Sequence, residues 1–221
     1  MRFGIALLVT AAMYAQGGWK EFTLGPPTRN QARFGPDGIR AAGVPLKRVL
    51  SRAYGLPEHR ILGPSWIAEE RYALTAVPAN PDDLQTLLQQ ELTNQFHMIA
   101  HREKRAVEVL VLKKMEGASE STPLKPVSGK PTVEATMSTG SLRLPQATLK
   151  SFAASLADMI VRPVFDETEM DSVFDINLTF QQGNIASLRK AVRDQLGLEL
   201  ADDRRVVDLV QIDHIEKPKF Q

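Results

Sequence analysis

The stretch PLKRVLSRAYG, residues 45–55, sets the expectation for how this chain folds. Its apolar residues recur at the spacing of one helix face: Leu46, Val49, Leu50 and Ala53. Gly55 follows in the position where a helix commonly ends. The stretch therefore predicts an amphipathic helix that needs a second element on which to bury its apolar face.

The same pattern returns in the second half of the chain as TLKSFAASLADM, residues 148–159. Thr148 is expected to cap a helix whose first residue, Leu149, aligns with Leu46. A segment with alternating apolar residues follows each helix, at 72–76 and at 174–178. Alternation of this kind is typical of half-buried strands.

A second helix is expected after each strand, with Asn80 and Asn184 as the residues that cap them. Their apolar stripes match at a constant offset of 104 residues, so that Leu84 aligns with Leu188. Each half is then expected to close with two strands around a turn, at 96–101 with 106–112 and at 198–200 with 206–212.

These patterns predict an α+β fold made of a tandem pseudo-repeat of two small units. Each unit is expected to hold two helices packed on a short antiparallel or mixed sheet. The first unit covers residues 19–115 and the second covers 141–218. Residues 116–140 between them are rich in Ser, Thr, Pro and Gly and are expected to form a linker, with a short edge strand around 132–135 as the alternative.

The N-terminal residues 1–15 have the pattern of a secretory signal. Arg2 precedes an uncharged run at 3–13, which is too short to span a bilayer. Ala15 and Gly17 are the alternative cleavage positions. We therefore expect an exported protein, periplasmic or extracellular, without stable membrane insertion after cleavage.

Composition excludes several classes of partner. The 27 Lys and Arg residues nearly balance the 26 Asp and Glu residues, which argues against nucleic-acid binding and against a strong attraction to anionic lipid. The chain has no Cys, so neither a disulfide nor a lipid-bearing cysteine is expected. The sequence leaves the oligomeric state undetermined.

Several residues have chemistry that catalytic or metal sites use, but their spacing predicts no catalytic, cofactor or metal site. His97 and His101 lack the Glu of a zinc peptidase motif and are expected in a strand, where they would lie about 13 Å apart. The acidic run at 166–171 lacks the register of a calcium loop and is expected to be a solvated turn. Asp213 and His214, adjacent in a strand, are expected to point to opposite faces.

Trp66 is the candidate partner-contact residue. Its ring is expected either to cap the core beneath residues 62–68 or to stand exposed as a platform for a sugar or a partner strand. An envelope protein or a polysaccharide is the partner class that an exposed ring would suit.

The sequence resembles one family in three stretches, residues 38–76, 162–178 and 195–218. The most specific pieces are AYGL at 53–56, GPSW at 63–66 and IDH at 212–214. They resemble the exported, soil-associated proteins of Acidobacteria known as domain of unknown function 3738. This resemblance implies an exported protein of unassigned activity, joined in some members to membrane-bound sensor-peptidase modules. Where the family usually has a Gly-bearing turn after its Asp-x-Thr, this chain has Glu169-Met170-Asp171-Ser172, so the turn conformation of the family is not expected to carry over.

Three functions remain open at this point. The first is a non-catalytic binding module of the cell envelope, which exposed sheet edges would suit. The second is an extracytoplasmic hydrolase whose carboxylates converge only in space. The third, implied by the resemblance alone, is a sensory or inhibitory domain for a membrane peptidase.

Overall fold

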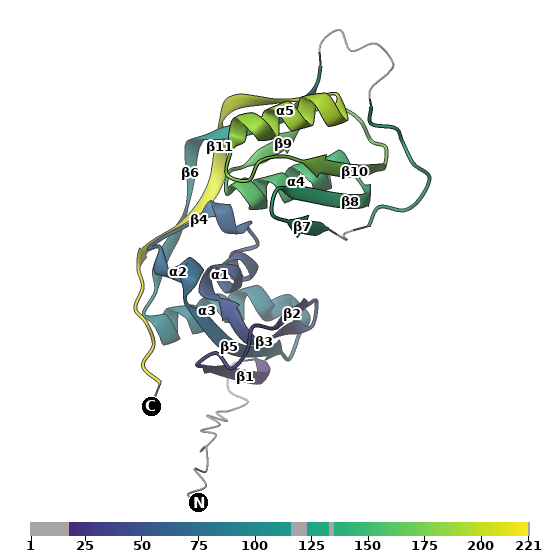
Figure 1. Cartoon of the computed structure of the whole chain (residues 1–221). Helices are drawn as coiled ribbons and strands as arrows, with labels where there is room; N and C mark the ends of the chain where they lie inside the picture. The colour runs from purple at the N-terminus through teal and green to yellow at the C-terminus, as the bar shows by residue number, and fades with distance from the viewer. Residues whose placement is uncertain (1–17, 116–122, 133–134, 221) are drawn as a thin grey trace, which may run out of the picture. The chain divides into compact units, whose positions relative to one another are not determined.

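The computed structural model describes residues 18–115, 123–132 and 135–220. Its two compact units are unit 1, from Met1–Glu103 and Leu209–Gln221, and unit 2, Lys104–Asp208 (Figure 1). Both units combine helices with a sheet, which confirms the predicted α+β class. The predicted signal segment at 1–15 lies outside the described residues.

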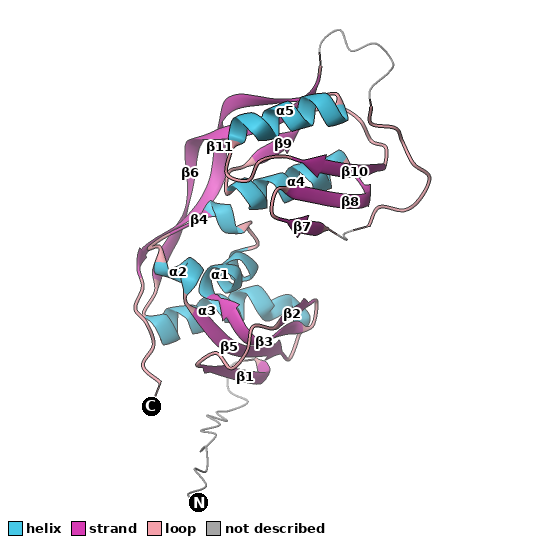
Figure 2. Ribbon diagram, in the orientation of Figure 1, coloured by secondary structure: helices cyan, strands magenta, loops and turns pink. Residues whose placement is uncertain are grey.

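Unit 1 is built on a four-stranded antiparallel sheet in the order β1-β5-β3-β2. Its elements in chain order are β1 (Trp19–Gly25), β2 (Ala32–Gly35), β3 (Gly38–Pro45), α1 (Leu46–Tyr54), η1 (Glu58–Arg60), β4 (Ile61–Leu62), α2 (Trp66–Glu69), β5 (Arg71–Pro78), η2 (Pro81–Asp83) and α3 (Leu84–Phe96). Ile39 on β3 pairs with Ala76 on β5, and both are fully buried. The apolar face of the sheet and the stripes of α1 and α3 form a single core (Figure 2).

Unit 2 is built on a three-stranded antiparallel sheet in the order β10-β8-β7. Its elements are β7 (Thr136–Ser138), β8 (Ser141–Ala147), α4 (Leu149–Ile160), β9 (Val164–Asp166), β10 (Phe174–Thr179) and α5 (Ile185–Leu196). Burial alternates along β10, where Phe174, Ile176 and Leu178 are buried and the residues between them are exposed. The buried face packs on α4 and α5 to form the core of this unit.

The prediction that each half closes with two strands around a turn is wrong. One long strand stands in place of each predicted pair. Residues Ile99–Lys114 form β6 and Leu198–His214 form β11, each without a turn, and the division between the units falls within both. The expected turn at 102–105 contains none of the residues that favour tight turns. The strands pair instead with distant segments, β6 with β9 and β11 with β4, both parallel. In the sheet β4-β11-β6-β9 the two long strands are neighbours.

The predicted helix caps are confirmed. Thr148 Oγ1 accepts a hydrogen bond from the Ser151 amide at 3.1 Å, and Asn184 Oδ1 accepts one from the Ser187 amide at 3.0 Å. Asn80 accepts from the Asp82 amide at 3.3 Å, but it caps the short 3-10 turn η2 that precedes α3. Satisfying the free amides at a helix start in this way fixes where each helix begins.

The first hairpins of the two units have the same register. Phe34 pairs with Ile39 in β2–β3, and Met137 pairs with Leu142 in β7–β8. Both residues of the second pair lie 103 positions after those of the first. The strand order β5-β3-β2 in unit 1 therefore has its counterpart in β10-β8-β7 of unit 2, and unit 1 adds β1 at one edge.

Part of the segment predicted as a linker packs on unit 2. Leu124 is buried against the core, and Pro126 forms a bridge with Phe174 on β10. Strand β7 at Thr136–Ser138 also falls within the predicted linker, a few residues after the edge strand considered at 132–135. The rest of that segment, at 116–122 and 133–134, lies outside the described residues.

Four helices end on a residue in the left-handed conformation: Gly55, His97, Val161 and Gly197. Glycine adopts this conformation without steric cost, whereas a β-branched side chain is strained there. Val161, with φ of 54° and 66% of its surface exposed, gains little packing to offset that strain.

Replacing Leu88 on α3 with Ala is expected to lower the free energy of unfolding by about 2–5 kcal/mol. The side chain is only 1% exposed, so its loss leaves a cavity in the core of unit 1. Val192→Ala on α5 removes fewer buried atoms and should cost less. Urea denaturation measures both, with the exposed Ser128→Ala as the control. A midpoint for Leu88→Ala equal to that of the parent would show that this face of α3 is not buried.

Two single variants, Val161→Gly and Gly55→Val, test the left-handed conformation at the helix ends. Val161→Gly is expected to raise the free energy of unfolding by about 0.5–1 kcal/mol, because it relieves left-handed strain. Gly55→Val, which introduces that strain at φ of 64°, is expected to lower it by about 1 kcal/mol. Denaturation midpoints of the two variants report both effects. A loss of stability in Val161→Gly would contradict the assigned conformation.

Candidate functional site

A solvent-open hollow with about 1430 Å³ of space lies in unit 2, where three chain segments meet. These segments are the β7–β8 turn, the end of α4 and the loop between β10 and α5. Six apolar side chains line it: Met137, Met159, Ile160, Phe180, Ile185 and Leu188. An apolar hollow with a few polar groups at its margin has the composition of a binding site.

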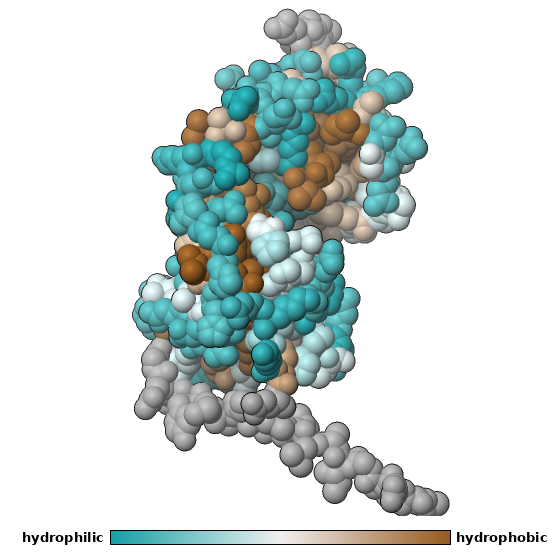
Figure 3. Space-filling view, turned by 90° about the vertical axis from the view of Figure 1, so that its left-hand side faces the viewer, coloured by the Kyte–Doolittle hydropathy of each residue, from teal (hydrophilic) through white to brown (hydrophobic). Residues whose placement is uncertain are grey.

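Exposed apolar side chains gather at this hollow. Met137 is 48% exposed and Ile185 is 43% exposed, and both line it. Val161, 66% exposed, stands between two lining residues, Ile160 and Arg162. Hydrophobic side chains also reach the surface of unit 2 on the face displayed in Figure 3. Exposed apolar groups close together on a folded protein commonly mark a contact surface.

The margin of the hollow is held by a close backbone approach. The Phe180 amide donates to the carbonyl of Gly140 at 2.9 Å. A Cβ at Gly140, whose φ is 75°, would lie 2.5 Å from the carbonyl oxygen of Phe180. Only glycine fits there, so the β7–β8 turn is fixed against the loop that leads into α5.

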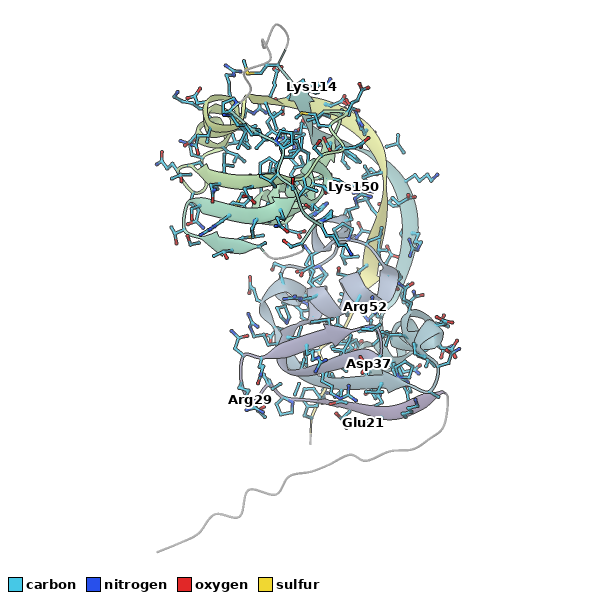
Figure 4. The ribbon with its side chains drawn as sticks, turned by 90° about the vertical axis from the view of Figure 1, so that its right-hand side faces the viewer. Glu21, Arg29, Asp37, Arg52, Lys114 and Lys150 are labelled. Carbon is cyan, nitrogen blue, oxygen red and sulfur yellow. The ribbon has the colours of Figure 1, made fainter. Side chains whose placement is uncertain are left out.

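The corresponding hairpin of unit 1 is covered. Phe34 is half-buried, and the Arg48 guanidinium lies 4.9 Å from the centre of its ring. Arg52, labelled on α1 in Figure 4, donates to the carbonyl of Gly35 at 3.2 Å. The positions 103 residues later are Ser151 and Ser155, whose hydroxyls bond to carbonyls of α4 and its cap. At the two positions where arginines of α1 contact the β2–β3 hairpin, α4 therefore carries short side chains that bond to its own backbone.

Arg162 is the one ionisable residue among those that line the hollow, and its charge is balanced within unit 2. Its guanidinium contacts Asp202 Oδ1 and the carbonyl of Val109, each at 3.1 Å. Arg189 reaches the other oxygen of Asp202 at 2.6 Å. The hydrogen bond from Arg189, together with the nearby charges of both arginines, lowers the pKa of Asp202. The hollow therefore offers apolar contact and hydrogen bonds more than net charge.

Trp66, the candidate contact residue from the sequence, lies in unit 1 and not at the hollow. It begins α2, is half-buried and packs against the core of unit 1. The Lys217 ammonium lies 5.4 Å from the centre of the ring, and Lys217 also pairs with Glu70. One face of the ring is therefore covered by the chain itself, and a role in partner contact stays a prediction.

One of the histidines lies outside its predicted strand, and another has a partner that was not predicted. His97 is the left-handed residue that ends α3, so its predicted place in a strand is wrong. His101 lies on β6, and its Nδ1 is 2.7 Å from Asp213 Oδ2. His214 approaches Glu216 at 3.1 Å instead of its neighbour Asp213. The His101–Asp213 pair was missed because it joins strands that are distant in the sequence.

The acidic run at 166–171 forms a turn anchored at its centre. Asp166 Oδ1 accepts hydrogen bonds from the amide and the hydroxyl of Thr168, at 3.0 and 2.7 Å. Thr168 is 1% exposed, whereas the carboxylate residues Glu167, Glu169 and Asp171 are exposed to solvent, as the sequence predicted. Glu169 has φ of 55°, a left-handed conformation, and is the first of the four residues at 169–172 that depart from the resembled family's turn. Glu167 pairs with Arg205 on β11.

Among the described residues, no helix is both long and apolar enough to cross a bilayer. Among the same residues, no three His, Cys, Asp or Glu side chains gather in a way that could hold a metal ion.

Comparison with known proteins gives one match. A family model described as "Protein of unknown function (DUF3738)" matches residues 47–215. No curated protein and no solved structure has a significant similarity to the chain. The match covers both units, including the hollow.

Asp202→Asn tests the charge network beside the hollow. A carboxyl whose pKa is lowered on folding stabilises the folded state above its ordinary pKa, and this contribution is lost as the pH falls through the lowered value. The thermal midpoint of Asp202→Asn should therefore lie below that of the parent at pH 7 and approach it below about pH 4. Scans at low salt keep this exposed interaction measurable. A difference that stays constant down to about pH 2 would contradict the network.

Proposed function

The chain belongs to the DUF3738 family, whose description assigns no function, and we propose that it is an exported, non-catalytic binding module of the cell envelope. The observation that carries the proposal is the apolar hollow of unit 2, with Met137 and Ile185 exposed at its margin. Side chains of this kind cost free energy in water, which a partner that covers them would recover.

Export is supported by residues 1–15, whose charge and hydropathy follow the pattern of a secretory signal. The absence of Cys from the sequence is compatible with an oxidising compartment, because the fold then does not depend on redox state. The partner would accordingly be an envelope protein or a polysaccharide.

We further infer that the two units descend from one duplicated unit. The shared hairpin register, the matching strand order and the caps at Asn80 and Asn184 support this origin. The two copies then differ where α1 carries Arg48 and Arg52 and α4 carries Ser151 and Ser155. On this account, duplication left one copy free to open a binding surface.

A hydrolase is the second candidate, and the His101–Asp213 pair is the observation that favours it. A carboxylate that binds one imidazole nitrogen orients the ring as a general base. Both side chains are about half exposed, so a substrate has access to them. This candidate places the active residues in unit 1, whereas the hollow belongs to unit 2, and a single experiment separates the two functions.

The experiment presents the purified chain to envelope extracts and to panels of glycans, esters and peptides. Ile185→Asp is expected to weaken partner capture about tenfold or more, because a charge then faces an apolar surface. Aspartate suits the first residue of α5, so the fold should be retained. The matched control is Val206→Asp, which alters an exposed apolar residue of unit 2 that does not line the hollow.

Equal capture by Ile185→Asp and Val206→Asp would contradict the proposal. Capture that is lost in Trp66→Ala would move the contact to unit 1. Turnover of a panel substrate that is abolished by His101→Gln would replace the binding module with the hydrolase.

A further inference from the structure

We propose that the partner at the hollow is an extended polypeptide segment that adds to β7 as a fourth strand of the β10-β8-β7 sheet. This inference rests on the proposed function, because it names the occupant of the same surface. Three features support it: the free backbone of β7, the side chains beside it and the segment that covers one end of the opposite edge of the same sheet.

The backbone of β7 has hydrogen-bonding groups that face away from its partner. Ser138 pairs with Ser141 across the two-residue turn, and Met137 pairs with Leu142 next to it. Successive residue pairs of an antiparallel ladder alternate between hydrogen-bonded and non-hydrogen-bonded pairs. The pair that closes a two-residue turn is hydrogen-bonded, so the next pair is not. The amide and carbonyl of Met137 therefore point away from β8. Within the described residues, β8 is the one strand that pairs with β7.

The side chains beside β7 favour an uncharged segment with alternating apolar residues. The Met137 side chain is on the same sheet face as its partner Leu142, which is 1% exposed and belongs to the core. A strand added at β7 would direct every second side chain to this face and into the hollow. Phe180 and Ile185 would meet those side chains. Arg162 already contacts Asp202, so an acidic residue in the partner would gain little there.

The opposite edge of the same sheet is covered at one end by an added segment. Pro126 bridges to Phe174, and the Val127 amide donates to the Val173 carbonyl at 2.8 Å, so this segment lies against the beginning of β10. The apolar surface beside β7 has no such cover among the described residues. A polypeptide complements both its free backbone groups and its apolar side chains, whereas a glycan complements neither as well.

Met137→Pro removes the outward amide without touching the hydrogen bonds between β7 and β8. Proline is tolerated at such a position on an edge strand. Met137→Leu keeps both the amide and an apolar side chain, and so serves as the matched control. The probe is a blocked heptapeptide of alternating Thr and Val, titrated against the full chain and followed by calorimetry. A second peptide carries N-methyl groups on alternate residues, which blocks strand pairing from the partner's side.

The expected result is binding of the unmodified peptide, weakened about tenfold by Met137→Pro and within about twofold of the parent for Met137→Leu. The N-methylated peptide should bind at least tenfold more weakly, which keeps the test valid if Met137→Pro fails to fold. Hydrogen exchange at the Met137 amide should slow when the unmodified peptide is bound.

Two results of the peptide experiment would overturn the inference. One is no binding of the unmodified peptide up to about 1 mM. The other is binding that Ile185→Asp abolishes but that Met137→Pro and N-methylation of the peptide leave unchanged. The hollow would then bind the peptide without strand addition, and the proposed function would stand. Capture of envelope partners that is indifferent to Ile185→Asp would remove the proposed function, and this inference with it.

Discussion

Burial of one apolar sheet face under two helices is the constraint on which the rest of the structure depends. In each unit the hairpin strands and the strand beside them direct alternate side chains to one face, and a helix pair covers that face. The strand register, the capped helix starts and the left-handed helix ends all follow from fitting helices to this face. In unit 2 the cover is incomplete beside β7, and the hollow is the part of the apolar surface that remains open.

The sequence predicted those parts of the fold that depend on neighbouring residues. The helix at 45–55 could be predicted because four apolar positions and a terminal glycine lie within one short stretch. The caps at Thr148 and Asn184 could also be predicted, because each cap side chain bonds to an amide only three residues later. Alternating burial at 174–178 was also recovered.

Features that depend on distant pairing were not predicted. The charged residues 102–105 interrupt the apolar pattern of β6, which suggested a turn, although an extended strand can equally present charges to water. The His101–Asp213 pair and the hollow are formed by segments that only the fold brings together. One difference between the halves was present in the sequence: Arg48 and Arg52, which contact the β2–β3 hairpin, correspond to Ser151 and Ser155 once the two halves are aligned.

The central claim is that unit 2 meets its partner at the hollow, and methionine methyl resonances test it most directly. Met137 and Met159 line the hollow, whereas Met98 is buried in the core of unit 1. In the full chain labelled at methionine methyls, the alternating Thr and Val heptapeptide should shift the signals of Met137 and Met159 and leave that of Met98 in place. A bound peptide that shifts Met98 while Met137 and Met159 stay unchanged would contradict the account.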